Sequence, residues 1–338
     1  MAGATFALLF VGAIGEIVRR GITSADGLSS FAAASTWVGL AFGAIALWTA
    51  AVAVRFSIQS SRETDAGEIL LARANAAQSR QSAWVSFGLL LALLIGFILV
   101  QLVFMNDGKI QKTFLQWELM RDSAMDVASA FLINIKLAVI SQIFVMVFGL
   151  LLAVARLTPG RAGAPIRFLA VAYIDLMRAV PAIIVLYLIG FGLPITNLPI
   201  ISSLSTEWFA ILALTLTYSA YVAEIYRSGI ASIHPSQWSA SRSLGFSYAQ
   251  TLRYFILPQS IRIVVPPMLS SFIALQKDTS LVNVIGTMDA FNQAKFYASS
   301  SFNLSSVTVV AIFFVIITIP QTRFVDWMLT RSANRKRG

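Results

Sequence analysis

Long runs of apolar residues, several of them long enough to cross a lipid bilayer, constrain this chain more than any other feature of its sequence. A helix needs about 20 mostly apolar residues to span the hydrocarbon core. Such runs occupy residues 3–18, 32–54, 83–105, 130–155, 168–194, 207–230, 258–285 and 305–328. The first run is short and can lie in the membrane interface instead, so we expect seven or eight spans. Because a spanning segment must satisfy its own backbone hydrogen bonds, the sequence predicts an all-α, polytopic membrane protein.

The composition agrees with a membrane protein. Hydrophobic residues make up 57% of the 338 residues and charged residues only 12%, about half the charged share of soluble domains. The net charge of +10 is carried at the ends of the apolar runs, which disfavours a nucleic acid as a partner. The chain has no cysteine and a single histidine. A metal site is therefore not expected, and we interpret His234 as a helix cap or a contact to lipid headgroups.

Basic residues predict the orientation, because cytoplasmic loops of membrane proteins collect Lys and Arg. They fall in the loop after 32–54, in the loop after 130–155, in the segment 232–258 and in the C-terminal tail 331–338. A single topology places all four groups in the cytoplasm, together with the C-terminus. The segments 106–126 and 287–304 then become loops on the opposite side.

Polarity divides the chain into two parts and a basic tail, 331–338. Residues 1–125 hold two or three spans and a cytoplasmic stretch, 57–82, which reads as an amphipathic helix or as a solvated connector. Residues 126–330 hold five spans with more polar residues inside them. We therefore expect a five-helix core that follows an N-terminal extension.

The polar segment "HPSQWSASRSLGFSYAQTLRYFILP", residues 234–258, lies between two apolar runs. Proline is common at the first position of a helix, so Pro235 suits a helix start. Gly245 stands where a helix must end and turn, since glycine adopts positive φ without steric cost. The segment therefore predicts a helix-turn-helix on the membrane surface, either as a structured connection or as a docking element for a cytoplasmic partner.

This segment resembles the EAA loop of ABC importer permeases, in particular those of the polar amino acid subfamily. That pattern is E-A-A, three residues, G, nine residues and I-x-L-P. Ser239, Ala240 and Ser241 stand at E-A-A, Gly245 at G, and Phe255, Leu257 and Pro258 at I-x-L-P. The family glutamate is therefore serine here, and only the first alanine, the glycine, the leucine and the proline agree.

Flanking sequences extend the resemblance to residues 126–330. They include "AYVAEIYRSGIASI" before the loop, Gln237 and Trp238 at a G-Q-W motif, and "KDTSL" at 277–281. The stretch "YIDLMRAVP" at 173–181 is similar to a Y-x-E-x-x-R-G-T-P motif. Residues 1–125 lie outside the resemblance.

The resemblance implies that the segment forms coupling helices, which fit a groove of an ATPase subunit. The residues then expected to couple to the ATPase are Gln237, Trp238, Ser239, Ala240, Ser241, Leu244, Gly245, Leu257 and Pro258. A neutral serine at position 239 makes a weaker hydrogen bond than a carboxylate, so docking should depend more on Trp238, Leu244 and shape.

The same resemblance implies the partners and the location. They are an ATP-binding cassette ATPase dimer, an extracytoplasmic amino-acid-binding protein, a second identical or sister permease, and the lipids of a bacterial inner membrane. The chain has no G-x-x-x-x-G-K-[ST] motif, so ATP and Mg should be bound by the ATPase rather than by this chain. We expect a transport subunit, not an enzyme, and no bound cofactor.

Ionisable residues inside spans are expensive and are therefore candidates for function. Lys277, Asp278, Thr279 and Ser280 are predicted to line the substrate pathway together with Arg178 and Glu224. In that hypothesis Asp278 meets an ammonium group and Lys277 a carboxylate. The alternatives are an internal ion pair, and charges that hold helices near the cytoplasmic boundary. The pairs Asp175–Arg178 and Glu224–Arg227 each lie on one helical face, and Pro266 and Pro267 are expected to interrupt their span.

Two other functions compete with an ATP-driven importer of a polar amino acid. An ion-coupled secondary amino acid transporter would use Glu224 and Asp278 for coupling, and such transporters commonly show internal repeats. No such repeat is visible in this sequence. A membrane scaffold that binds partners through residues 1–125 would have no use for charges within the spans.

Overall fold

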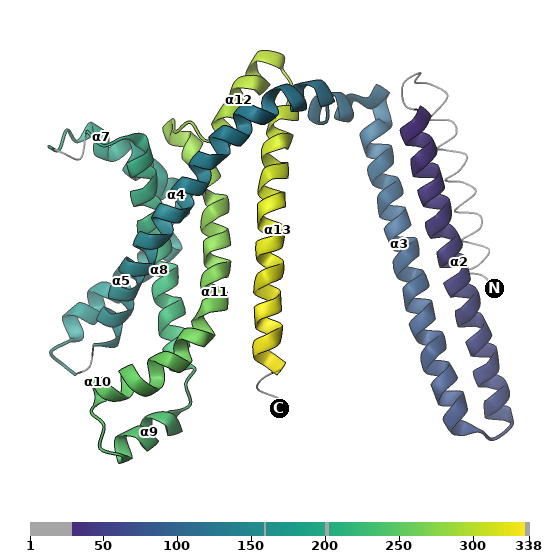
Figure 1. Cartoon of the computed structure of the whole chain (residues 1–338), viewed down its shortest axis with the longest axis horizontal. Coiled ribbons are helices and arrows are strands. Elements are labelled where there is room, and N and C mark those ends of the chain that lie inside the picture. The colour runs from purple at the N-terminus through teal and green to yellow at the C-terminus, as the bar shows by residue number, and fades with distance from the viewer. Residues whose placement is uncertain (1–28, 159, 200–202, 335–338) are drawn as a thin grey trace. The chain divides into compact units, whose positions relative to one another are not determined.

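The computed structural model describes residues 29–158, 160–199 and 203–334, and all the elements that it assigns there are helices. The chain divides into two compact units, residues 1–112 and 113–338 (Figure 1). Among the described residues, five helices are long and apolar enough to cross a membrane, or six when one bent pair is counted as a span. The predicted all-α, polytopic class is confirmed. The run 3–18 lies outside the described residues.

The described residues of the first unit form a hairpin of two long helices, α2 (Ser29–Asp65) and α3 (Ile69–Phe114). Serine hydroxyls join them by donating to backbone carbonyls of the other helix: Ser79 to Ala53 at 2.8 Å, and Ser86 to Ala46 at 3.0 Å. Small residues at the contact let two helices approach closely without a thick apolar layer. The number of spans in this N-terminal part stays a prediction.

We predicted an amphipathic helix or a solvated connector for the stretch 57–82, and it forms the closed end of this hairpin. Residues 57–65 end α2, residues 66–68 turn, and 69–82 begin α3. Gly67 has φ +82°, a conformation that favours glycine. Side chains clamp both sides of the turn, since the Asn75 amide donates to both Glu63 carboxylate oxygens at 2.7 and 2.8 Å. Periodicity alone did not reveal this turn.

The second unit begins with α4 and ends with α13. Its elements are α4 (Trp117–Leu157), α5 (Ala164–Ala179), α6 (Ala182–Tyr187), η1 (Leu188–Gly192), α7 (Leu193–Ile195), α8 (Thr206–Ala231), α9 (Pro235–Ser243), α10 (Tyr248–Thr251), η2 (Leu252–Ile256), α11 (Leu257–Asp278), η3 (Thr279–Ile285), α12 (Ala290–Ser301) and α13 (Ser305–Asn334). η1 and η2 are π-helical turns, and η3 is a 3-10 helix.

Helix α8 is the central helix of this unit and packs closely along α4. At Gly149 of α4 an added Cβ would lie 2.9 Å from Val222 of α8, so the two backbones meet where there is room only for glycine. The predicted span 168–194 is bent rather than straight, with 103° between α5 and the helices from Ala182 to Ile195. Val180 is extended there, as the residue before a proline prefers.

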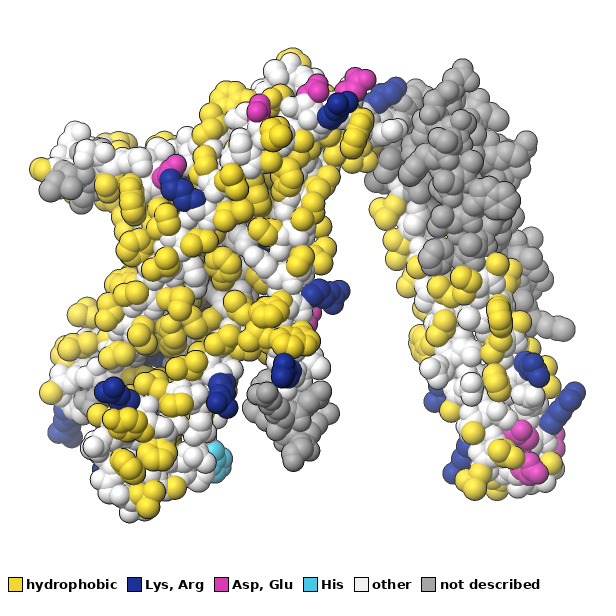
Figure 2. All heavy atoms as spheres, viewed as in Figure 1, with side chains coloured by type: hydrophobic (Ala, Val, Ile, Leu, Met, Phe, Trp, Pro, Cys, Tyr) yellow, Lys and Arg dark blue, Asp and Glu magenta, His cyan; other side chains and the backbone are white. Residues whose placement is uncertain are grey.

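The two ends of this unit differ in composition. In Figure 1, α9, α10 and the end of α13 lie at one end, while α7 and α12 lie at the other. Figure 2 shows a broad band of hydrophobic side chains between the ends, with Lys and Arg gathered near α9 and α10. A hydrophobic band between polar ends is what a membrane-spanning unit requires.

Three local expectations are wrong. The segment 106–126 is not a loop, because α3 continues to Phe114 and α4 begins at Trp117. The segment 287–304 is not a loop throughout, since it contains α12. Pro266 and Pro267 do not interrupt their span, since α11 runs through both. A proline fixes φ near the helical value and removes only one backbone donor, so the helix continues past both residues.

Candidate functional site

The segment 232–258 forms the predicted helix-turn-helix. Helix α9 starts at Pro235, and the His234 ring nitrogen Nδ1 accepts from the Ser236 backbone N–H at 3.2 Å. His234 is therefore the N-cap, one of the two roles predicted for it. Gly245 has φ +88° just after α9, and Ser247 caps α10 in a capping box with Gln250. Each boundary follows from a local rule of helix capping.

Aromatic contacts fix the two helices of the segment 232–258 against each other. The rings of Trp238 and Tyr248 stack with centroids 5.3 Å apart, and Phe246 meets Phe255 edge to face at 5.0 Å. Ser241, which is buried, donates to the Thr251 hydroxyl at 3.1 Å. The segment therefore has a small core of its own.

The predicted ATPase contacts separate into an exposed and an internal set. Gln237, Ser239, Ala240 and Leu244 are exposed, and Leu244 exposes 73% of its surface. Trp238 and Ser241 hold the segment together instead, while Leu257 and Pro258 start α11. Contact of any of them with an ATPase stays a prediction. Leu244 is thus an exposed apolar side chain at the end of a polar helix.

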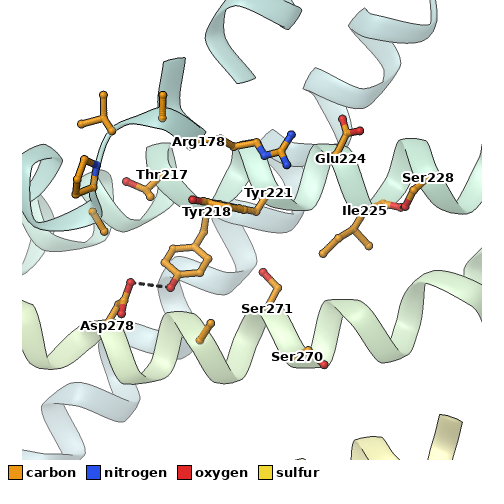
Figure 3. A pocket seen from close by; sticks show the side chains of 15 residues that line it. Arg178, Thr217, Tyr218, Tyr221, Glu224, Ile225, Ser228, Ser270, Ser271 and Asp278 are labelled. Carbon is orange, nitrogen blue, oxygen red and sulfur yellow. Dashed lines mark hydrogen bonds between the residues drawn. The ribbon is translucent and has the colours of Figure 1, made fainter. Parts of the chain in front are cut away.

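A cavity of about 780 Å³ lies among the bend from α5 to α6, helix α8 and helix α11. Its wall consists of Arg178, Ala179, Val180, Pro181, Ala182, Thr217, Tyr218, Tyr221, Glu224, Ile225, Ser228, Ser270, Ser271, Ala274 and Asp278. Figure 3 shows side chains from α8 on one side of this space and from α11 on the other. Its size and its few polar groups suit a small solute.

Charged groups of opposite sign lie in the cavity wall. The Tyr218 hydroxyl donates to the Asp278 carboxylate at 2.8 Å (Figure 3). The Arg178 guanidinium lies over the Tyr221 ring, 5.9 Å from its centroid. The cavity can thus offer a carboxylate to a cation and a guanidinium to an anion.

Only half of the predicted pathway set meets in this cavity. Arg178, Glu224 and Asp278 belong to its wall, whereas Lys277, Thr279 and Ser280 do not. Adjacent residues on a helix point about 100° apart, so Lys277 is exposed while Asp278 faces the cavity. Arg178, rather than Lys277, is the cation that shares the cavity with Asp278.

Glu224 is the centre of an ion-pair group at the end of the cavity toward α9. It forms the predicted pair with Arg227 and also accepts from Arg156 of α4 at 2.7 Å. Asp175 and Arg178, both described, do not form the other predicted pair. Glu224 therefore joins α4 to α8 as well as lining the cavity.

We expect the Glu224→Gln substitution to destabilise the protein by about 1–3 kcal/mol, because it leaves two cations without their anion. Exposure keeps the loss below that of a fully buried pair: the side chains of Arg156, Glu224 and Arg227 are 25%, 22% and 35% exposed. Thermal unfolding of the purified protein in detergent measures the loss. Glu207→Gln is the control, since its pair with Lys136 is more exposed and should contribute at most about 1 kcal/mol.

A second polar group is fully buried between α4, η3 and the start of α12. The Asn134 amide of α4 donates to the Thr279 hydroxyl and to the Asp289 carboxylate, at 3.1 Å each. Its oxygen accepts from the Ala290 backbone N–H at 3.0 Å. Burial raises the pKa of the Asp289 carboxyl above its ordinary value, while these hydrogen bonds oppose the shift.

Sequence reasoning missed several of these residues. Asn134 interrupts the apolar run 130–155, and that interruption was an available signal. Tyr218 and Tyr221 gave no signal, since tyrosines are common in membrane helices. Asp289 was hidden in a segment predicted as a loop.

Comparisons with known proteins agree on one group. The family described as binding-protein-dependent transport system inner membrane component matches residues 145–338. The probable glutamine ABC transporter permease protein GlnM of Bacillus subtilis is 35% identical over 186 residues, which cover 55% of this chain and 83% of the relative. The glutamate transport system permease protein GluC of Corynebacterium glutamicum is 33% identical over 218 residues, with 61% and 94% covered.

A solved structure supports the fold. The chain is similar to a structure described as an amino acid ABC transporter with histidines, with a TM-score of 0.59 and 28% sequence identity. The similarity covers 64% of this chain and 99% of the other. The structure of the MetNI methionine ABC transporter, at 19% identity and a TM-score of 0.51, agrees in fold alone.

Proposed function

This chain belongs to the family of binding-protein-dependent transport system inner membrane components, and on that premise we propose that it carries a polar amino acid into the cytoplasm. It is a membrane-spanning permease subunit of an ABC importer, as its similarity to amino acid permeases indicates. The substrate is our proposal, and the names of the relatives agree with it.

The observation that carries the substrate proposal is the pair of opposite charges in the cavity wall. An α-amino acid presents an ammonium group and a carboxylate on neighbouring atoms. Asp278 would receive the ammonium group and Arg178 the carboxylate, which a guanidinium can bind through two parallel hydrogen bonds. The Tyr218 hydroxyl donates a hydrogen bond to Asp278 and would hold the Asp278 side chain in position.

The end of the unit that contains α9 and α10 would face the cytoplasm. Arg156, Arg242 and Arg253 lie in or beside the connections at that end, which the positive-inside rule assigns to the cytoplasm. Since α13 ends at the same end (Figure 1), the C-terminus would be cytoplasmic too. The segment 232–258 would thus be accessible to an ATPase.

The remaining partners follow from the same premise. A dimer of ATPase subunits would bind ATP and Mg, and this chain would bind neither. A soluble binding protein would deliver the substrate on the outer side, and a second permease, identical or sister, would complete the path. ATP would drive transport because it binds one conformation of the complex better than the other and so shifts the population.

Reconstitution in liposomes tests this function. The chain should import a polar amino acid only together with its ATPase, its binding protein and ATP. An ion gradient without the ATPase should drive no uptake. Uptake by the chain alone under such a gradient would establish an ion-coupled secondary transporter instead.

A further inference from the structure

Past Asp278, the last wall residue of α11, apolar side chains of α6 and η3 pack together. The wall continues from Pro181 and Ala182 into α6 and η1, and from Asp278 into η3. Val185 and Leu186 of α6 share one buried cluster with Val282 and Ile285 of η3. We call these four side chains the apolar plug. A solute in the cavity can leave in this direction only if η3 separates from α6 and η1.

The contact between η1 and η3 is unusually close. An added Cβ at Gly190 would lie within 2.9 Å of the Ile285 Cβ, so Ile285 occupies space that only glycine leaves free. Both elements are irregular, since η1 is a π-helical turn and η3 a 3-10 helix. Such turns within longer helices often mark functional hinges.

A polar group holds η3 in place from the side that faces α4. Asn134, Thr279 and Asp289, each 0% exposed, come from α4, from the first residue of η3 and from the N-cap of α12. The Thr279 hydroxyl accepts from Asn134 at 3.1 Å and donates to the Gln276 carbonyl at 2.7 Å. Asp289 accepts from the Asn292 N–H at 3.0 Å through its other oxygen.

This arrangement does more than pack a core. Apolar side chains would fill the same space without fixing one geometry, whereas buried hydrogen bonds are satisfied in only one arrangement of the three elements. η3 ends at Gly286, which has φ +83°, so a glycine in the left-handed conformation lies between Thr279 and Asp289. The network therefore spans both sides of a place where the chain can bend.

We propose that Asn134, Thr279 and Asp289 form a latch that keeps η3 seated on η1 and closes the outer end of the cavity. Asn134 is a positioning residue in this device, because it acts on the pathway through η3. The latch must release for the transporter to face outward. The proposal rests on the chain being an import permease with an outward-facing state.

A single introduced cysteine can report how often the latch opens, since the chain has no cysteine of its own. Val282→Cys puts a thiol in the apolar plug, where the native side chain is fully buried. The complex with its ATPase, without nucleotide, is treated from the outer side with a membrane-impermeant maleimide. Adding Thr279→Val keeps the side-chain shape and removes the hydroxyl. It should raise the labelling rate about tenfold, because the hydrogen bond from Asn134 is the one that ties this residue to α4. The ratio of binding-protein-stimulated to basal ATPase activity should fall as well.

Two further variants distinguish a latch from general loosening. Thr279→Ser keeps the hydroxyl and should label as slowly as the parent. Ser306→Ala removes a buried hydroxyl that donates to the Ala294 carbonyl at 2.9 Å, outside the network, and should also leave labelling unchanged. Labelling of the Thr279→Val protein at the parent rate would overturn the proposal, as would equally fast labelling of either control. Since labelling requires no import, the result is independent of the uptake assay.

Discussion

Replacing Asp278 with asparagine is expected to lower uptake of the substrate by about 10- to 100-fold, the value of a hydrogen bond to a charged group. The Tyr218 hydroxyl donates to the Asp278 carboxylate at 2.8 Å. Asparagine keeps an oxygen that can accept this hydrogen bond, so the wall of the cavity should keep its shape. What it loses is the negative charge that the ammonium group would meet. Uptake of a radiolabelled amino acid into proteoliposomes with the ATPase and the binding protein measures the effect, with ATP hydrolysis followed in parallel.

Lys277→Gln is the matched control for Asp278→Asn. Lys277 precedes Asp278 in the chain and carries a full charge, but it is exposed and lies outside the cavity wall. Its substitution should leave uptake within about twofold of the wild type, as is usual for surface positions. Loss of uptake in Lys277→Gln with retention in Asp278→Asn would show that the substrate passes on the other side of α11.

The helix-turn-helix of the segment 232–258 could be predicted from the sequence because its geometry is local. His234 and Pro235 set the start of α9, and Gly245 sets its end. Each acts through the backbone of its immediate neighbours, so no knowledge of the rest of the molecule was needed. The division between exposed Leu244 and internal Ser241 was not predictable in this way, since it depends on the partner Thr251 in the next helix.

The cavity could be predicted only in part. The charges of Arg178, Glu224 and Asp278 drew attention to three residues of the cavity wall, because ionisable groups are costly in a membrane. The inward-facing side of each helix was not evident from the sequence, since the side that faces lipid is as apolar as the side that faces protein. This ambiguity placed Lys277 beside Asp278 in one site. The tyrosines of α8 complete the cavity through contacts 60 residues apart, such as Tyr218 with Asp278.

Connections were the least predictable part. The segments 57–82 and 106–126 are rich in polar residues, which indicated a surface helix and a loop. The structure instead extends long helices through both, and only short breaks at 66–68 and 115–116 separate them. Helices that continue beyond the hydrocarbon core can satisfy their backbone while their side chains meet water. The polarity of such a segment therefore predicts that it lies outside the hydrocarbon core, but not whether it is helical.

Replacing Leu244 with aspartate is expected to weaken binding of the ATPase subunit by at least about 100-fold. Burial of one leucine at an interface contributes about 1.5–3 kcal/mol, and a carboxylate buried in its place adds a desolvation cost. Leu244 has the exposure expected of such an anchor, at 73%. The family glutamate is replaced by Ser239 here, which leaves docking more dependent on apolar contact. Co-purification of the ATPase with the permease in detergent, and the affinity from titration, measure the effect.

Phe302→Asp is the matched control for Leu244→Asp. Phe302 is 95% exposed in the connection from α12 to α13, at the end of the unit away from α9 (Figure 1). It also has φ +50°, a conformation that aspartate tolerates better than phenylalanine. Because the same apolar-to-acidic change is made there, general loss of solubility or folding would appear in both variants. If Leu244→Asp retains the ATPase as tightly as Phe302→Asp does, α9 and its turn are not where the ATPase docks.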